Sequence, residues 1–153
     1  MKPRLLVSAC LLGTPCRYDG KSKKNEAVCA LAERFELVPV CPEVLGGLPT
    51  PRTPSERRGA RVVMRDGHDV TAEYRRGAEC ALETARREGV LAAVLKERSP
   101  SCGSGEIYDG TFTGALTAGD GVTAELLKAN GIAVFGESEQ SLTKFLCVVG
   151  HST

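Results

Sequence analysis

The most constraining feature of this sequence is the alternation of short apolar segments with helical patterns. Four short segments have the composition of buried β-strands, namely residues 4–9, 36–40, 91–95 and 132–135. The stretches between them show the apolar spacing of amphipathic helices. Strands that alternate with helices are typical of right-handed βαβ units and a mainly parallel sheet.

Helix-capping residues support this division of the chain. Asn25 and Thr71 are expected N-caps, and Gly89 and Gly131 are expected stops. The helices predicted in this way cover residues 26–35, 71–88, 123–130 and, starting at Ser138 or Gln140, a last segment up to residue 149.

Two Asp-Gly pairs add a second kind of element. Residues 61–65 and 68–71 flank the first pair, and residues 107–108 and 111–113 flank the second, which predicts two small hairpins. The length of 153 residues fits one domain. We therefore expect an α/β fold: a single Rossmann-like domain over residues 1–153, with a mainly parallel sheet flanked by helices, plus small hairpins.

Composition excludes several classes of protein. The net charge is +1, which argues against stable nucleic-acid binding, and the lysines at residues 21–24 suit a solvated loop. No apolar run approaches the roughly 20 residues that span a bilayer. The apolar stretch before Ser8 has three residues, too short for a signal peptide, so residues 4–9 are interpreted as a strand. We expect a cytoplasmic protein.

Three of the seven cysteines are placed where a site would form. Cys10 and Cys41 directly follow the first two predicted strands, and Cys102 lies in the loop after the third. Parallel strands deliver the loops that follow them to one edge of the sheet, where ligands bind. An odd number of cysteines in a reducing compartment favours metal binding or thiol chemistry over a disulfide framework.

The other cysteines receive different interpretations. Cys29, Cys80 and Cys147 lie on predicted apolar helix faces and are assigned to the core. Cys16 shares a loop with Cys10, so it is either a fourth ligand or a free thiol. His68 and His151 are expected at the surface, without a zinc role.

The loops around these cysteines carry further candidates. The loop over residues 41–52 offers Glu43 and Arg52, and the loop over residues 99–105 offers hydroxyl groups. Taken alone, Glu43 is equally an exposed loop charge and Ser101 a turn residue. Arg52 is equally the partner of Glu56 in a structural salt bridge.

Dispersed thiolates suit zinc or an iron–sulfur cluster, and spacing does not choose between them. Three cysteine ligands leave one coordination position open for water or substrate. Two alternatives without this catalysis remain: an iron–sulfur or zinc binding module, and a thiol-redox protein that uses Cys10 and Cys16.

Several specific motifs are spread along the chain. In chain order they are residues 7–13 (VSACLLG), 17–20 (RYDG), 41–43 (CPE), 46–49 (GGLP), 51–52 (PR), Lys96 with 99–103 (SPSCG), 121–124 (GVTA) and 131–132 (GI). Together they resemble the thiouracil desulfidase family, from about Leu5 to Glu137, and the combination is specific to that family.

This resemblance implies a 4Fe–4S cluster on Cys10, Cys41 and Cys102, with one iron not bound by protein. The open iron would take the sulfur of a small thiolated base, which is converted from thiouracil to uracil plus sulfide without redox change. The family's acidic residue corresponds to Glu43 and its serine to Ser101; both are expected to be catalytic. Cys16 is not carried over as a ligand. Larger relatives that act on thiolated tRNA have an additional domain, so a free base is expected here.

The chemistry of the implied reaction suggests a role for each of four residues. Glu43 beside a cluster is suited to moving a proton of water or of the ring, and Ser101 to relaying a proton or orienting the base. We also expect Ser99 and Arg52 to bind substrate, Arg52 through a carbonyl oxygen.

Overall fold

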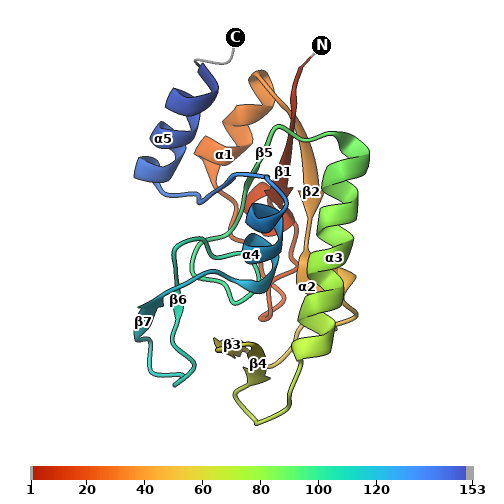
Figure 1. Cartoon of the computed structure of the whole chain (residues 1–153), viewed down its shortest axis with the longest axis vertical. Helices are drawn as coiled ribbons and strands as arrows, with labels where there is room; N and C mark the ends of the chain where they lie inside the picture. The colour runs from red at the N-terminus through yellow and green to blue at the C-terminus, as the bar shows by residue number, and fades with distance from the viewer. Residues whose placement is uncertain (1, 151–153) are drawn as a thin grey trace.

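A four-stranded parallel sheet forms the centre of the computed structural model, which describes residues 2–150. The strand order is β2-β1-β5-β8, and every pairing in the sheet is parallel (Figure 1). The strands are β1 (Arg4–Ser8), β2 (Glu36–Val40), β5 (Ala92–Val94) and β8 (Val134–Phe135). The predicted α/β class is confirmed, and β2 has its predicted bounds.

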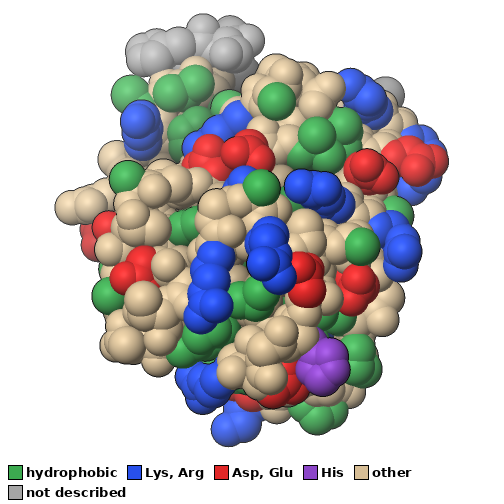
Figure 2. All heavy atoms as spheres, turned by 60° about the horizontal axis from the view of Figure 1, so that its bottom comes forward, with side chains coloured by type: hydrophobic (Ala, Val, Ile, Leu, Met, Phe, Trp, Pro, Cys, Tyr) green, Lys and Arg blue, Asp and Glu red, His purple; other side chains and the backbone are tan. Residues whose placement is uncertain are grey.

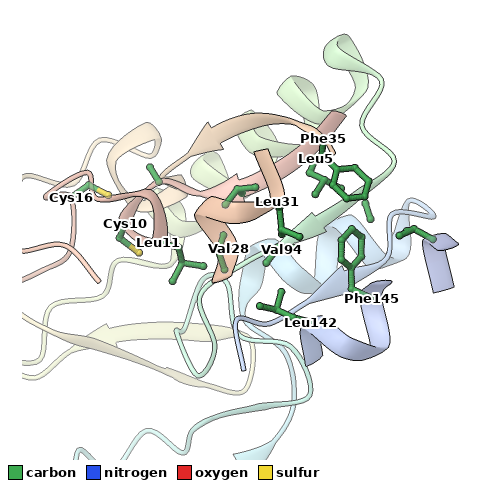
Figure 3. Close-up of a cluster of buried hydrophobic side chains, with 14 residues drawn as sticks. Leu5, Cys10, Leu11, Cys16, Val28, Leu31, Phe35, Val94, Leu142 and Phe145 are labelled. Atoms are coloured by element: carbon green, nitrogen blue, oxygen red, sulfur yellow. The ribbon is translucent and has the colours of Figure 1, made fainter. Parts of the chain in front are cut away.

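Helices cover both faces of this sheet. On one face, Leu5 and Val7 of β1 pack with residues of α1 and α5, including Phe145 (Figure 3). On the other, Leu6 packs with residues of α3 and α4. Burial on both faces explains why β1 is a continuous apolar run. The helices are α1 (Glu26–Ala30), α3 (Thr71–Glu88), α4 (Val122–Ala129) and α5 (Glu139–Gly150), with 3-10 segments η1 (Ala9–Leu12) and η2 (Leu31–Glu33).

The helix boundaries test the predicted caps. Asn25 caps α1, since its Oδ1 accepts a hydrogen bond from the Val28 N–H at 3.0 Å. The Thr71 cap was wrong: the helix begins at Thr71, whose Oγ1 instead accepts from the Val62 N–H at 2.9 Å. Gly89 ends α3 in the left-handed conformation, as predicted.

The first predicted hairpin has a different partner. The main pairing joins β3 (Ser55–Arg58) to β4 (Arg61–Met64). The Asp66-Gly67 turn contributes only an isolated bridge between Val63 and Asp69. Because the turn between Arg58 and Arg61 is tight, β3 lies directly beside β4. The antiparallel pairing of β4 with β3 is longer than its pairing with residues 68–71.

The second predicted hairpin also pairs differently. Strand β6 (Glu106–Tyr108) pairs with β7 (Leu116–Ala118), not with residues 111–113. The cause lies in another element: Glu56 of β3 accepts hydrogen bonds from the N–H groups of Gly110 and Phe112, at 2.9 and 3.1 Å. These bonds hold the turn against β3.

Both hairpins lie below the carboxyl ends of β1 and β2 in Figure 1, on the side of the sheet where a site was predicted. Among the helices within residues 2–150, none combines the length and the apolar character that a membrane crossing requires. The fold thus directs attention to the loops at this edge.

Candidate functional site

Cysteine-bearing loops follow three strands at this edge. Cys10 lies in η1 just after β1, Cys41 comes immediately after β2, and Cys102 lies in the loop that follows β5. Strand β1 is paired with both β2 and β5, so the three loops leave neighbouring strands. Cys10 and Cys102 are buried and Cys41 is half-buried.

The thiols of this edge lie near one another or near hydroxyl groups. Cys16 is buried, the Cys41 Sγ donates to its carbonyl oxygen at 3.8 Å, and the nearby Cys10 thiol is the main cause of its raised pKa. The neighbouring Cys16 thiol and burial raise the pKa of Cys41. Burial raises the pKa of Cys102 to about 12, although Ser8 and Ser101 oppose this. A metal binding here displaces protons from these thiols.

The remaining cysteines differ in burial and surroundings, and the Cys29 Sγ donates to the Leu11 carbonyl oxygen, next to Cys10, at 3.7 Å. Cys147 is exposed, so its assignment to the core was wrong; the buried side of α5 is formed by Leu142, Phe145 and Val149. Cys29 and Cys80 are only partly buried. The surface prediction for His68 is confirmed by its exposed side chain, and His151 lies outside the described residues.

A short helix that the sequence did not reveal carries Glu43. Helix α2 (Pro42–Leu45) starts directly after Cys41 and packs on α3 through two glycines. A Cβ atom on Gly46 would lie 2.0 Å from a backbone oxygen of α3, and one on Gly77 would lie 1.9 Å from the Pro42 oxygen. Both positions exclude any side chain, and this close approach brings Glu43 against α3.

Two side chains bind the carboxylate of Glu43. The Arg52 Nη2 donates to Oε2 at 2.8 Å, and the hydroxyl of Tyr74, on α3, donates to Oε1. Arg52 was considered as a partner of Glu56, but Glu56 instead binds backbone N–H groups. Burial lowers the pKa of Arg52, but the Glu43 carboxylate outweighs this, and the pKa is raised.

Arg52 also connects two site loops. Its side chain is 2% exposed, and its Nη2 donates to the Cys16 carbonyl oxygen at 3.0 Å. Its Nη1 donates to the Pro49 carbonyl and to the Thr50 hydroxyl. Within the described part of the chain its buried Nε has no hydrogen-bond partner. The two terminal nitrogens of Arg52 thus hold the site loops and Glu43 together.

Hydroxyl groups organise the loop that carries Cys102. The Ser99 Oγ accepts from the N–H groups of Ser101 and Cys102, at 3.0 and 3.1 Å. Ser101 is 1% exposed; its Oγ lies 2.8 Å from the Thr123 Oγ1 and 3.8 Å from the Cys102 Sγ. Both serines thus lie next to the site. Sequence reasoning did not single out the side chains of Tyr74 and Thr123, because only the fold brings their helices to these loops.

The spread of the thiols tests which metal group fits. Among residues 2–150, no three His, Cys, Asp or Glu side chains are arranged to hold one metal ion. A single zinc ion would need its sulfurs within about 4 Å of each other. Here Cys10 and Cys41 pack with the α1 and α5 side of the sheet and Cys102 with the α3 and α4 side. Cysteine thiolates are the donors that hold iron–sulfur clusters, so this donor set fits one.

The surface around this edge has a mixed character. Seen from the bottom of Figure 1, Lys and Arg side chains stand among hydrophobic, acidic and other side chains (Figure 2). A nucleic-acid-binding face has a concentrated positive charge. The face in this view does not show such a concentration.

Comparisons with known proteins agree with this geometry. The family model of 2-thiouracil desulfurase matches residues 5–139. A curated relative, the uncharacterized protein YbbK of Bacillus subtilis (strain 168), is 45% identical over 145 aligned residues, and the match covers 88% of this chain and 96% of that protein. The solved structure of the [4Fe-4S]-dependent thiouracil desulfidase TudS is 50% identical, with a TM-score of 0.90 over 97% of this chain and 99% of that one. The chain belongs to the 2-thiouracil desulfurase family.

Proposed function

We propose that this chain is an iron–sulfur-dependent desulfidase that converts a small thiolated base, such as thiouracil, to the oxygen analogue plus sulfide. The observation that carries this proposal is the meeting of three cysteine loops with the buried Glu43–Arg52 pair at one sheet edge. Membership of the family and the likeness to a thiouracil desulfidase support it.

Cys10, Cys41 and Cys102 are the proposed ligands of a 4Fe–4S cluster that keeps one iron free of protein ligands. Such an iron supplies a thiophilic Lewis acid for the sulfur of a thiocarbonyl. The reaction needs no electron donor or acceptor, because C=S and water give C=O and hydrogen sulfide.

Glu43 is the proposed base that removes a proton from the attacking water. Both of its oxygens already accept hydrogen bonds, from Arg52 and from Tyr74, which fixes the carboxylate as an acceptor. Arg52 is proposed to bind a substrate carbonyl oxygen, because its guanidinium is held beside Glu43 at this edge. Ser101, beside Cys102, is proposed to relay a proton or orient the base, and Ser99 to hold this loop in place for substrate.

The proposed substrate is a free base rather than a nucleic acid, because the chain has a net charge of +1 and a mixed surface at this edge. Seven cysteines and a thiol-rich site suit the reducing conditions of the cytoplasm, which is the proposed location.

The first experiment measures sulfide release from 2-thiouracil and 4-thiouracil under argon, with the iron content of the same sample. Glu43→Ala should keep its iron and lose about 10²–10⁴-fold in rate, the usual contribution of a general acid or base. Full activity in this variant would remove Glu43 from the mechanism, and loss of iron would make it a structural residue.

Cysteine variants test the cluster itself. Alanine at Cys10, Cys41 or Cys102 should each abolish the brown iron–sulfur absorption, whereas Cys16→Ala should retain it. If Cys16→Ala also lost the absorption, a fourth thiolate would fill the substrate position, and a non-catalytic binding module would be the better interpretation.

A thiol-redox protein is the second candidate, because both Cys10 and Cys16 are buried free thiols and Cys10 is the largest influence on the pKa of Cys16. It predicts a reversible disulfide between these cysteines and no iron in protein purified without air. Iron that copurifies with the anaerobic protein would exclude it.

A further inference from the structure

Tyr74 is placed where a phenylalanine would satisfy every apolar contact. It lies in the second turn of α3, is 1% exposed, and packs in a small cluster with Leu48, Val62 and Val70. Its hydroxyl leaves this cluster and donates to the Glu43 Oε1. Burying a hydroxyl is unfavourable unless it finds a partner, and here Glu43 is that partner.

The hydroxyl acts as a donor over the whole neutral range. Burial and the nearby Glu43 charge raise the pKa of Tyr74 well above that of a free tyrosine. A phenol that stays protonated can only donate to a carboxylate. The Glu43 side chain thus has one fixed donor on each oxygen, Tyr74 on Oε1 and Arg52 on Oε2.

These two donors come from different parts of the chain. Arg52 lies at the far end of the loop that also carries Glu43, whereas Tyr74 belongs to the long helix α3. The glycine contact between α2 and α3 sets the distance between the carboxylate and the hydroxyl. Tyr74 is therefore the connection between the carboxylate and a rigid element of the fold.

We propose that Tyr74 is a positioning residue, which holds the Glu43 carboxylate in the orientation that the reaction requires. This inference rests on the proposed function of Glu43 and adds a residue to it. Tyr74 is not proposed to touch substrate or the cluster. Its effect on the rate should therefore depend entirely on the presence of Glu43.

The kinetic test is a double-mutant cycle of Tyr74→Phe and Glu43→Ala, assayed by sulfide release from thiouracil. Tyr74→Phe should lower kcat about 10- to 100-fold, as expected for a lost hydrogen bond to a charged group, with KM within about 2-fold. In the Glu43→Ala background it should change the residual rate less than about 2-fold. Equal losses in both backgrounds, or a changed KM with an unchanged kcat, would overturn the proposal.

Two measurements separate positioning from general damage. Iron content should be unchanged in Tyr74→Phe. Tyr108→Phe, which alters a tyrosine on β6, should behave as wild type. If Tyr74→Phe lost its iron, or if Tyr108→Phe lost as much activity, a specific role for Tyr74 would be excluded.

A thermal cycle on the cluster-free protein gives a readout that does not depend on activity. Tyr74→Phe should lower Tm when Glu43 is present, and leave Tm unchanged or raise it in Glu43→Ala, where the hydroxyl has lost its acceptor. The same decrease in both backgrounds would mean that Tyr74 acts through packing alone. Wild-type protein that holds iron but releases no sulfide would overturn the proposed function, while this cycle still decides whether Tyr74 holds Glu43.

Discussion

The two loops that form the site are attached to the fold in different ways. Both use glycine to approach a helix: residues 41–52 approach α3 at Gly77, and residues 99–105 approach α4 at Gly121, where a Cβ would lie 2.4 Å from Ser101. The first loop is then held by a buried charge pair, Glu43 with Arg52. The second is held by neutral hydroxyls and by backbone bonds.

This difference determines how each loop tolerates change. Three backbone hydrogen bonds, none longer than 2.8 Å, join the second loop to the start of α4. The Gly121 N–H donates to the Gly103 carbonyl, the Val122 N–H to the Pro100 carbonyl, and the Thr123 N–H to the Ser101 carbonyl. Such bonds survive a side-chain substitution. The first loop has a backbone bond from the Arg52 N–H to the Tyr18 carbonyl, but its Glu43–Arg52 pair depends on side chains, and removing one partner of a largely buried ion pair leaves the other charge without compensation. We therefore expect substitutions in the first loop to cost more stability than those in the second.

The largest effect is expected for Arg52→Met. This change leaves the Glu43 Oε2 and the Cys16 carbonyl without the Arg52 donor, and should lower the free energy of unfolding by about 3–5 kcal/mol, the range for breaking a buried pair. Urea denaturation of the cluster-free protein measures it. The matched control is Arg61→Met, which removes an exposed partner of Asp69 and should change stability little. Similar losses in both variants would contradict the comparison.

An intermediate effect is expected for Gly77→Ala. In an exposed helix this change stabilises by about 1 kcal/mol, but here the added methyl meets the Pro42 oxygen, so α2 must shift. We expect a loss of about 1–3 kcal/mol, as in other overpacked contacts, and a fall in sulfide release because Glu43 moves. Glu79→Ala, at an exposed position of the same helix, serves as control. A stabilised Gly77→Ala would refute the close contact.

The smallest effect is expected for Thr123→Val, in α4 where it meets the second loop. The Ser101 hydroxyl loses its 2.8 Å partner, which should cost about 1 kcal/mol, while the backbone bonds remain. Iron content should be unchanged and sulfide release should fall by less than about 10-fold. A loss as large as that of Arg52→Met would show that the hydroxyls, rather than the backbone, hold this loop.

Elements set by local pattern were predictable from sequence, and elements set by distant contacts were not. Strand β2 and the Asn25 cap follow from neighbouring residues and were correct. The partner of the second hairpin was wrong because Glu56 binds Gly110, 54 residues away. Helix α2 was missed because its four residues are too few for a periodic pattern.

The site shows the same division. The placement of Cys10, Cys41 and Cys102 after parallel strands was visible in the sequence, because the topology of a parallel sheet dictates where such loops lie. The donors to Glu43 were not visible: Arg52 had two possible partners, and Tyr74 lies 31 residues from Glu43 on a helix whose apolar pattern explains it as core. The side chain that makes a contact between two elements is set by tertiary packing. A short stretch of sequence does not contain that information.

The shortness of α2 has a consequence for how the protein loses activity. A helix of four residues has no stability of its own in water. Packing against α3 stabilises α2. The orientation of Glu43 is therefore kept only while the first turns of α3 stay folded. Local opening at that end of α3, at a free energy below that of global unfolding, releases the carboxylate while the sheet stays folded. Inactivation on heating then precedes denaturation, and hydrogen exchange at residues 74–77 would follow the loss of rate.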